Sequence, residues 1–187
     1  DVEYSQLYIK VNSMKILVWA VIALSSVLST GCAVTNTDAA DKFRQMVLDD
    51  PNGNHSSITL RNSSGQVINI IKNRTAPCLD RTVVMTTQNK YGKILSEQTL
   101  KYNPTLVIDD STALLTVQLL INGVGMVAGE TPEKGMYVFL ADIVPVSEEQ
   151  TRLDIYRNEY PGAARIEDSI KDWVIRKSLK CPDLNKK

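Results

Sequence analysis

Alternating apolar and polar positions predict the strands of this protein. Residues 112–122 alternate with a period of two, which is typical of a strand with one face in a core. One face of that strand holds Ala113, Leu115, Val117, Leu119 and Ile121. Residues 135–146 are apolar on both faces as far as Asp142, which indicates a central strand. Shorter strands are expected at residues 57–61, 82–88, 104–110 and 151–157.

Two stretches with apolar residues at a spacing of three to four predict helices. Residues 63–76 begin with serines that suit an N-cap, and Pro77 is expected to end or kink this helix. Residues 162–182 carry a second stripe, with Lys177 and Lys180 at the carbonyl end, where the helix dipole favours cations. The stripe consists of Ile166, Ile170, Trp173 and Val174. Four charged residues lie largely off it, namely Glu167, Asp168, Lys171 and Asp172.

Together these strands and helices predict an α+β domain over residues 57–187. We expect an antiparallel sheet of about 4–6 strands with two helices packed on one face. Residues 32–56 are expected to form a flexible tether. Residues 33–42 are small and polar without periodicity, and residues 48–57 have the proline, asparagine and glycine content of a loop.

The apolar run before Cys32 has the pattern of a secretory signal peptide. Residues 14–31 contain Met14, a positive charge at Lys15, an apolar body and then smaller residues. The apolar body is shorter than the roughly 20 apolar residues that cross a membrane. Residues 1–13 lack an initiating Met and are read as an upstream extension, an expression remnant or a mis-assigned start.

The sequence LSTGC at residues 28–32 resembles the lipobox of bacterial prolipoproteins. The resemblance implies cleavage between Gly31 and Cys32, transfer of a diacylglycerol to the Cys32 thiol, and acylation of the new amino group. Several acyl chains on one residue anchor a protein stably, whereas one chain alone is marginal. Ala33 rather than Asp follows the cysteine, which in this family favours the outer membrane, with the domain facing the periplasm. The alternative is a signal peptide that is cut elsewhere, with an incidental cysteine.

The body of the chain resembles a broad group of small, mostly uncharacterised bacterial envelope lipoproteins over roughly residues 57–184. The resemblance rests on Cys78, on the long central strands, and on a terminal helix with Trp173 followed by KCPDL at residues 180–184. It implies an envelope location and a compact α+β fold. It implies no activity.

The charge of the chain is balanced, with 21 Lys and Arg against 21 Asp and Glu. This balance argues against a nucleic-acid-binding protein, which usually carries a basic patch. With Cys32 assigned to lipid, Cys78 and Cys181 remain, and in an exported domain we expect them to form a disulfide. Each closes a predicted helix, so the bridge would join the two helix ends. The alternatives are two free thiols or a redox pair, although CxxC spacing is absent.

Few residues are candidates for catalysis or metal binding. His55 is the single histidine and is expected to be a solvated loop residue. Asp109 and Asp110 would point to opposite faces of a strand, so a turn is the better interpretation. Because Cys78 and Cys181 are assigned to a bridge, no cluster of histidine and cysteine ligands is available. We therefore expect no enzymatic activity, no metal and no cofactor.

Residues 123–135 form a glycine-rich connection between two predicted strands. The glycines are similar to those of phosphate-binding loops, but no helix with a Lys-Ser or Lys-Thr pair follows. A long hairpin connection is therefore expected. Val124, Met126 and Val127 are then either tucked under the loop or exposed as a small contact patch for a partner.

Two functions remain open after these observations. The leading hypothesis is a lipid-anchored, non-enzymatic envelope protein that docks on another envelope protein or polymer. The alternative is a binding module for a small apolar or lipid-like ligand held between sheet and helices. A large apolar cavity under Trp173 would favour ligand binding, and a dense core with an exposed 123–135 loop would favour docking.

Overall fold

The computed structural model describes residues 36–123 and 135–185. The chain divides into two compact units after Asn36, and the described residues beyond Asn36 belong to the second unit, Thr37–Lys187. The elements in chain order are α2 (Asn36–Asp49), β1 (Asn54–Leu60), α3 (Ser64–Leu79), β2 (Arg81–Gln88), β3 (Ile94–Asp109), β4 (Thr112–Gly123), β5 (Met136–Ser147), β6 (Gln150–Arg157) and α4 (Ala163–Arg176).

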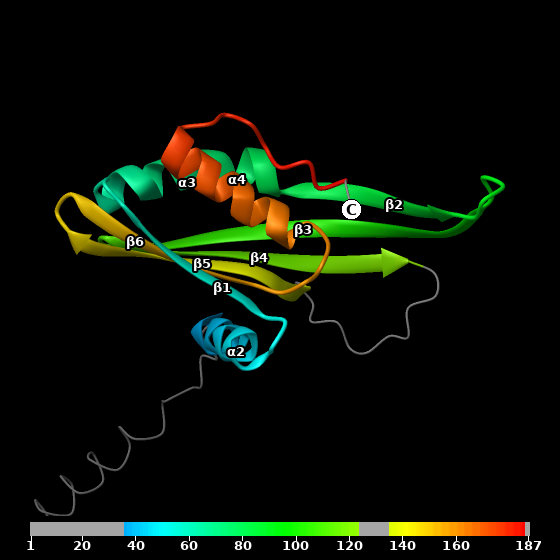
Figure 1. The fold of residues 1–187 in the computed structure, drawn as a ribbon, viewed down its shortest axis with the longest axis horizontal. Helices are drawn as coiled ribbons and strands as arrows, with labels where there is room; N and C mark the ends of the chain where they lie inside the picture. The colour runs from blue at the N-terminus through cyan, green and yellow to red at the C-terminus, as the bar shows by residue number, and fades with distance from the viewer. Residues whose placement is uncertain (1–35, 124–134, 186–187) are drawn as a thin grey trace, which may run out of the picture. The chain divides into compact units, whose positions relative to one another are not determined.

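The strands form one antiparallel sheet of six strands in the order β1-β6-β5-β4-β3-β2 (Figure 1). Strands β2 to β6 follow one another as a meander, and β1 then pairs with β6, where Ile58 lies opposite Leu153. This topology confirms the predicted antiparallel sheet. It also places β5 in the interior of the sheet, as its unbroken apolar sequence predicts.

Helices cover both faces of this sheet. Helices α3 and α4 lie on one face and α2 lies on the other (Figure 1). Adjacent residues of β4 show the division, because Leu115 belongs to the main core under α3 and α4, whereas Leu114 packs with α2. The largest fully buried side chains are Trp173, Tyr102 and Phe139, all in the main core. The prediction of two helices on one face is therefore correct for α3 and α4 but omits α2.

Helix α2 shows that the prediction of a flexible tether over residues 32–56 was wrong from Asn36 onward. Ala40, Phe43 and Val47 recur at helical spacing, and all three are buried with Leu140 of β5. The helix contains six apolar residues, but only these three are buried, and the others are exposed among polar residues, so the helix signal in the sequence was weak. The three buried residues suffice here because the facing surface of the sheet is itself apolar.

A half-buried pair of charged groups also attaches α2 to the sheet. The Arg44 guanidinium donates to the two carboxylate oxygens of Asp142 on β5, from Nε at 2.8 Å and from Nη2 at 2.6 Å. Arg44 also pairs with Asp41 one turn earlier in α2. The hydrogen bond to Asp142, opposed by burial, raises the pKa of Arg44 above its ordinary value. This bidentate geometry fixes the direction of the guanidinium as well as its position.

The ends of the two helices predicted from sequence differ from the expectation. Pro77 lies inside α3, which continues to Leu79. A proline in the last turn removes one donor only, and the N–H of Asp80 still donates to Ala76 O at 3.2 Å. Helix α4 ends at Arg176, because Lys177 adopts a left-handed conformation with φ of 53°. Lys180 therefore lies beyond the helix.

Strand β3 is longer than the predicted strand over residues 104–110. It begins at Ile94 and pairs with β2 over its first half, with Val83 opposite Leu100 and Arg81 opposite Tyr102. Both Leu100 and Tyr102 are buried in the main core. Polar residues at 96–99 hid this alternation in the sequence.

Candidate ligand-binding groove

A groove with a volume of about 560 Å³ opens where β6 leads into α4. Its floor and walls come from Met85 of β2, from residues 157–162, and from Ala164, Arg165 and Asp168 in the first turns of α4. We call it the end groove. Sites for small molecules have volumes of roughly 300–1,000 Å³, so the end groove is large enough to hold one.

Hydrogen bonds fix the wall formed by residues 157–162. Asn158 Nδ2 donates to Tyr137 O at 3.1 Å, and Asn158 Oδ1 accepts from the N–H of Tyr160 at 3.1 Å. The hydroxyl of Tyr102 on β3 donates to Pro161 O at 2.9 Å. This segment therefore crosses from the end of β6 towards β3, which explains how residues near β6 and Met85 of β2 line the same groove.

Gly162 and Tyr102 meet at the inner side of this wall. Gly162 has a φ of 82°, a left-handed conformation that side chains disfavour. A Cβ at this position would lie 2.6 Å from Tyr102 Oη and 3.2 Å from Leu184 Cδ2. Burial raises the pKa of Tyr102 to about 12, so the hydroxyl keeps its proton and remains a donor at neutral pH. Only glycine allows the wall to approach Tyr102 this closely.

A buried carboxylate is hydrogen-bonded to Arg157 of the groove wall. Glu167 on α4 accepts hydrogen bonds from Arg157 Nε at 2.6 Å, Ser56 Oγ at 2.8 Å and Lys171 Nζ at 2.5 Å. Burial alone would raise the pKa of Glu167, but the hydrogen bonds from Lys171, Ser56 and Arg157 outweigh it and hold the pKa below its ordinary value. The prediction that Glu167 lies off the buried stripe was wrong, because only 8% of the residue is exposed. Its carboxylate ties α4 to β1 and β6.

The end groove presents both apolar and charged groups to a ligand. Met85 is half-buried, and Tyr160 exposes 42% of its surface at the opening. Arg165 and Asp168 stand one turn apart on α4 and give the rim one charge of each sign. Arg157 and Glu159 add a second charge of each sign, so the lining is more polar than that of a usual small-molecule site, which is mostly apolar with a few polar groups. The groove therefore suits an amphipathic molecule.

The residues considered for catalysis lie away from this groove. His55 is exposed as expected, but it lies in β1 and not in a loop, and its ring stacks on Tyr156 with centroids 4.6 Å apart. Asp109 ends β3 and Asp110, with φ of 50°, forms the turn to β4, which confirms the turn interpretation. Across residues 36–123 and 135–185, no group of three or more His, Cys, Asp or Glu side chains is placed to hold a metal ion.

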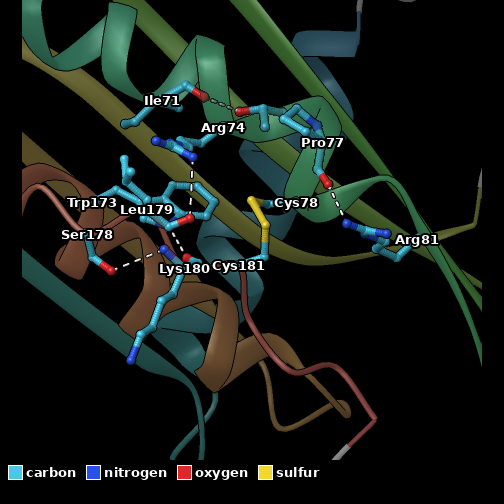
Figure 2. The surroundings of a disulfide bond; sticks show 11 residues. Ile71, Arg74, Pro77, Cys78, Arg81, Trp173, Ser178, Leu179, Lys180 and Cys181 are labelled. Atoms are coloured by element: carbon cyan, nitrogen blue, oxygen red, sulfur yellow. Dashed lines mark hydrogen bonds between the residues drawn. A yellow bond between two sulfur atoms is a disulfide. The ribbon is translucent and has the colours of Figure 1, made fainter.

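The predicted disulfide is present, and Figure 2 shows its surroundings. Cys78 in the last turn of α3 is bonded to Cys181, which lies in the segment after α4 rather than at the helix end. Trp173 Nε1 donates to Lys180 O at 2.7 Å, and Arg74 Nη1 donates to Leu179 O at 3.3 Å. The bridge and these two hydrogen bonds hold the segment after α4 across both helices.

The space next to Trp173 is a groove on the surface. Trp173 is fully buried in the main core. An open groove of about 240 Å³ lies on its outer side, between α3 and the segment after α4, and is lined in part by Ile70, Arg74 and Leu179. The structure therefore places the larger opening at the end groove, and not under Trp173 as the ligand-binding hypothesis expected.

Several predicted site residues lie outside the described part of the chain. These are the cleavage and lipidation residues Gly31 and Cys32 and the candidate contact residues Val124, Met126 and Val127. In the residues that are described, no helix combines the length and apolar character needed to cross a membrane.

No family model matches the sequence, and no curated protein matches it. Solved structures similar to this chain include a START superfamily protein from Mycobacterium smegmatis, which is 10% identical, with 67% of this chain and 99% of that chain covered at a TM-score of 0.34. Norcoclaurine synthase from Thalictrum flavum, in complex with dopamine and hydroxybenzaldehyde, is 10% identical, with 68% and 88% covered at 0.28. A conserved protein from Geobacillus kaustophilus is 16% identical, with 66% and 87% covered at 0.30. Such low TM-scores establish neither a shared fold nor a shared ligand.

Proposed function

We propose that this domain is a binding module that holds a small amphipathic molecule in the end groove. The observation that supports the proposal is a groove of about 560 Å³ whose wall is already fixed by hydrogen bonds from Tyr102 and Asn158. A wall that is ordered before binding costs less conformational entropy when the ligand arrives. The apolar part of the ligand lies over Met85 and Tyr160, and its polar part lies at Arg165 and Asp168.

The proposed role is binding without catalysis. The Arg157 guanidinium on the groove wall pairs with Glu167 and Glu159, and Glu167 is itself held by three donors. These pairings stabilise the wall. Neither Arg157 nor Glu167 is therefore in the activated state that a general base or nucleophile needs.

Blocking the groove tests the proposal. Ala164→Trp places a large ring at an exposed position of the groove wall, and Ala76→Trp places the same ring at an exposed position of α3 outside it. With anilinonaphthalene sulfonate as the amphipathic probe, we expect Ala164→Trp to weaken binding at least about tenfold, which corresponds to about 1.4 kcal/mol. Ala76→Trp should leave the affinity unchanged. Equal affinities for the two variants would contradict the proposal.

Methyl NMR locates the bound probe independently of the variants. Met85 lines the groove, whereas Met46 is an exposed residue of α2. Titration of methionine-labelled protein with the same probe should move the Met85 methyl resonance and leave that of Met46 in place. Equal shifts at both methyl groups would indicate non-specific binding.

We also propose that the chain is anchored in the bacterial envelope through lipid on Cys32, in the outer membrane facing the periplasm. Support comes from the sequence LSTGC behind an apolar signal and from Ala33 after the cysteine. Mass spectrometry should find a mature N-terminus at Cys32 carrying acyl chains, and Cys32→Ala should release the protein. An unmodified Cys32 within an intact precursor would overturn the anchor. Fractionation with inner-membrane markers would overturn only the choice of membrane.

Docking on an envelope protein or polymer stays a prediction from the sequence. Its candidate contact residues Val124, Met126 and Val127 lie outside the described residues. Crosslinking from Val124 in intact cells distinguishes the two functions. A trapped protein or glycan supports docking, and a co-purified small molecule without any crosslinked partner supports the binding module.

A further inference from the structure

The turn between β2 and β3 carries exposed apolar side chains that no part of the described domain covers. In residues 89–95, which we call the hairpin tip, Tyr91 is 80% exposed, Ile94 53% and Leu95 62%. The hairpin extends past the layer of α3 and α4 and ends in this tip (Figure 1). Thr87 pairs with Ser96 and Gln88 pairs with Ile94, so Leu95 is an extra residue that interrupts the regular pairing of β2 and β3. The three exposed apolar side chains therefore gather at the end of the hairpin, where the regular strand pairing stops.

Hydrogen bonds within the turn hold the backbone of the hairpin tip. Asn89 Oδ1 accepts from the N–H groups of Tyr91 at 2.9 Å and Lys93 at 3.0 Å. Gly92 supplies the positive φ of 76° that the turn requires. Lys90 Nζ lies 5.0 Å from the centroid of the Tyr91 ring. This turn therefore presents Tyr91 between two lysines.

The hairpin tip differs in charge from the exposed apolar residues at the opposite end of the sheet. No acidic residue occurs between Asn89 and Ser96, and the tip carries Lys90 and Lys93. At the opposite end of the sheet, exposed Val107, Ile108 and Val146 stand beside carboxylates at the two turns there. These carboxylates are Asp109, Asp110, Glu148 and Glu149. The tip carries positive charge alone, so a negatively charged surface attracts it more strongly than it attracts the turns at the opposite end.

We propose that the hairpin tip is a membrane-contact element that enters the headgroup region of a bilayer containing anionic lipid. Tyrosine favours that region because its ring is apolar and its hydroxyl is wet. Lysine stems extend along apolar surface and place their ammonium groups at lipid phosphates. Each lysine near an anionic surface contributes roughly a fivefold change in partition. The inference rests on the described domain alone, so it is independent of lipid on Cys32 and of the end groove.

Tryptophan probes at the two ends of the sheet test the proposal in the full chain. Tyr91→Trp reports on the tip, and Val146→Trp is the matched control at an exposed apolar position of the acidic end. Vesicles of phosphatidylethanolamine and phosphatidylglycerol carry brominated lipid as the quencher. We expect the emission of Trp at 91 to shift to the blue and to be quenched, relative to the background from Trp19 and Trp173, and that of Trp at 146 to be unchanged. Equal quenching at both positions, or none at 91, would overturn the proposal and leave a protein partner for the tip.

Removing the lysine charges tests the lipid class. In the Tyr91→Trp chain, Lys90→Gln with Lys93→Gln should lower the quenching, with about a 25-fold weaker partition of the tip for the two together. Lys42→Gln with Lys72→Gln removes two exposed charges from α2 and α3 and serves as the control. The same tip should be quenched less in vesicles of phosphatidylcholine alone. Quenching that is insensitive to both the lysines and the lipid charge would overturn the assignment to anionic lipid.

Discussion

Arg157, the last residue of β6, donates a 2.6 Å hydrogen bond from Nε to the carboxylate of Glu167 on α4. Ser56 and Lys171 donate to the same carboxylate, so one side chain joins β1, β6 and α4. Removing one member of a buried charge network leaves the others without their partner. We expect Glu167→Gln to lower the free energy of unfolding by about 2–3 kcal/mol in urea titration. The neighbouring exposed Asp168→Asn is the control, and an equally small loss for both would contradict this role.

The same carboxylate predicts a pH dependence of stability. Because the pKa of Glu167 is lower in the folded protein than in the unfolded chain, folding favours its ionised form. Its contribution is fully present above the unfolded pKa of about 4.3 and is lost as the pH falls through the lower folded value. The stability difference between wild type and Glu167→Gln should therefore narrow below about pH 4.3. A difference that stays constant between neutral and acid pH would contradict the lowered pKa.

Gly162 and Tyr102 should be energetically coupled. Gly162→Ala introduces a Cβ 2.6 Å from Tyr102 Oη at a φ of 82°, so we expect it to destabilise the fold by about 2 kcal/mol. Tyr102→Phe removes the hydroxyl that the new Cβ would meet. In that background Gly162→Ala should cost less, and a double-mutant cycle measures the difference. Additive costs would show that backbone strain, and not the contact, sets the effect.

Periodic patterns explain why most of the fold was predictable. The alternation at Leu115 and Val117 and the stripe at Ile166 and Trp173 each report a face that is buried in the main core. Helix α2 was missed because its apolar stripe has only three buried residues, and the sequence does not show that the outer face of the sheet is there to cover them. The first half of β3 was missed because polar residues at 96–99 hide the alternation around Leu100.

The end groove could not be predicted from the sequence. Its wall over residues 157–162 contains the turn sequence NEYPG, which signals a connection but not its path. That path is set by the hydrogen bond from Tyr102 to Pro161 O, a contact between residues 59 positions apart. Met85 is far in the sequence from residues 157–162. It lines the same groove because β2 lies next to β3, the strand that carries Tyr102. The disulfide was predicted because two cysteines remained to pair once Cys32 was assigned to lipid.

The attachment of α2 should depend on Arg44. Its guanidinium makes two hydrogen bonds to Asp142 on β5, and both side chains are about one-fifth exposed, at 21% each. We expect Arg44→Gln to lower stability by about 1–2 kcal/mol and to speed hydrogen exchange in residues 39–49. The neighbouring Gln45→Ala removes only an exposed contact to Asp49 and is the control. Unchanged exchange in α2 would show that Ala40, Phe43 and Val47 hold it without the ion pair.

The bridge between Cys78 and Cys181 should contribute to stability through the length of chain that it closes. The two residues are 103 positions apart, and closing a loop of that length is worth about 4–5 kcal/mol in the chain-entropy treatment. We expect Cys78→Ser with Cys181→Ser to lose most of this stability in urea titration.

A tryptic map without reductant should join TAPCLDR to CPDLNK. Hydrogen exchange in the double variant should rise first in residues 178–185. Without the bridge, that segment keeps the hydrogen bonds from Trp173 and Arg74 but loses its covalent link to α3. Two thiols that react with an alkylating agent in the native protein would contradict the bridge. A double variant as stable as wild type would contradict its energetic role, because the hydrogen bonds alone would then hold the segment.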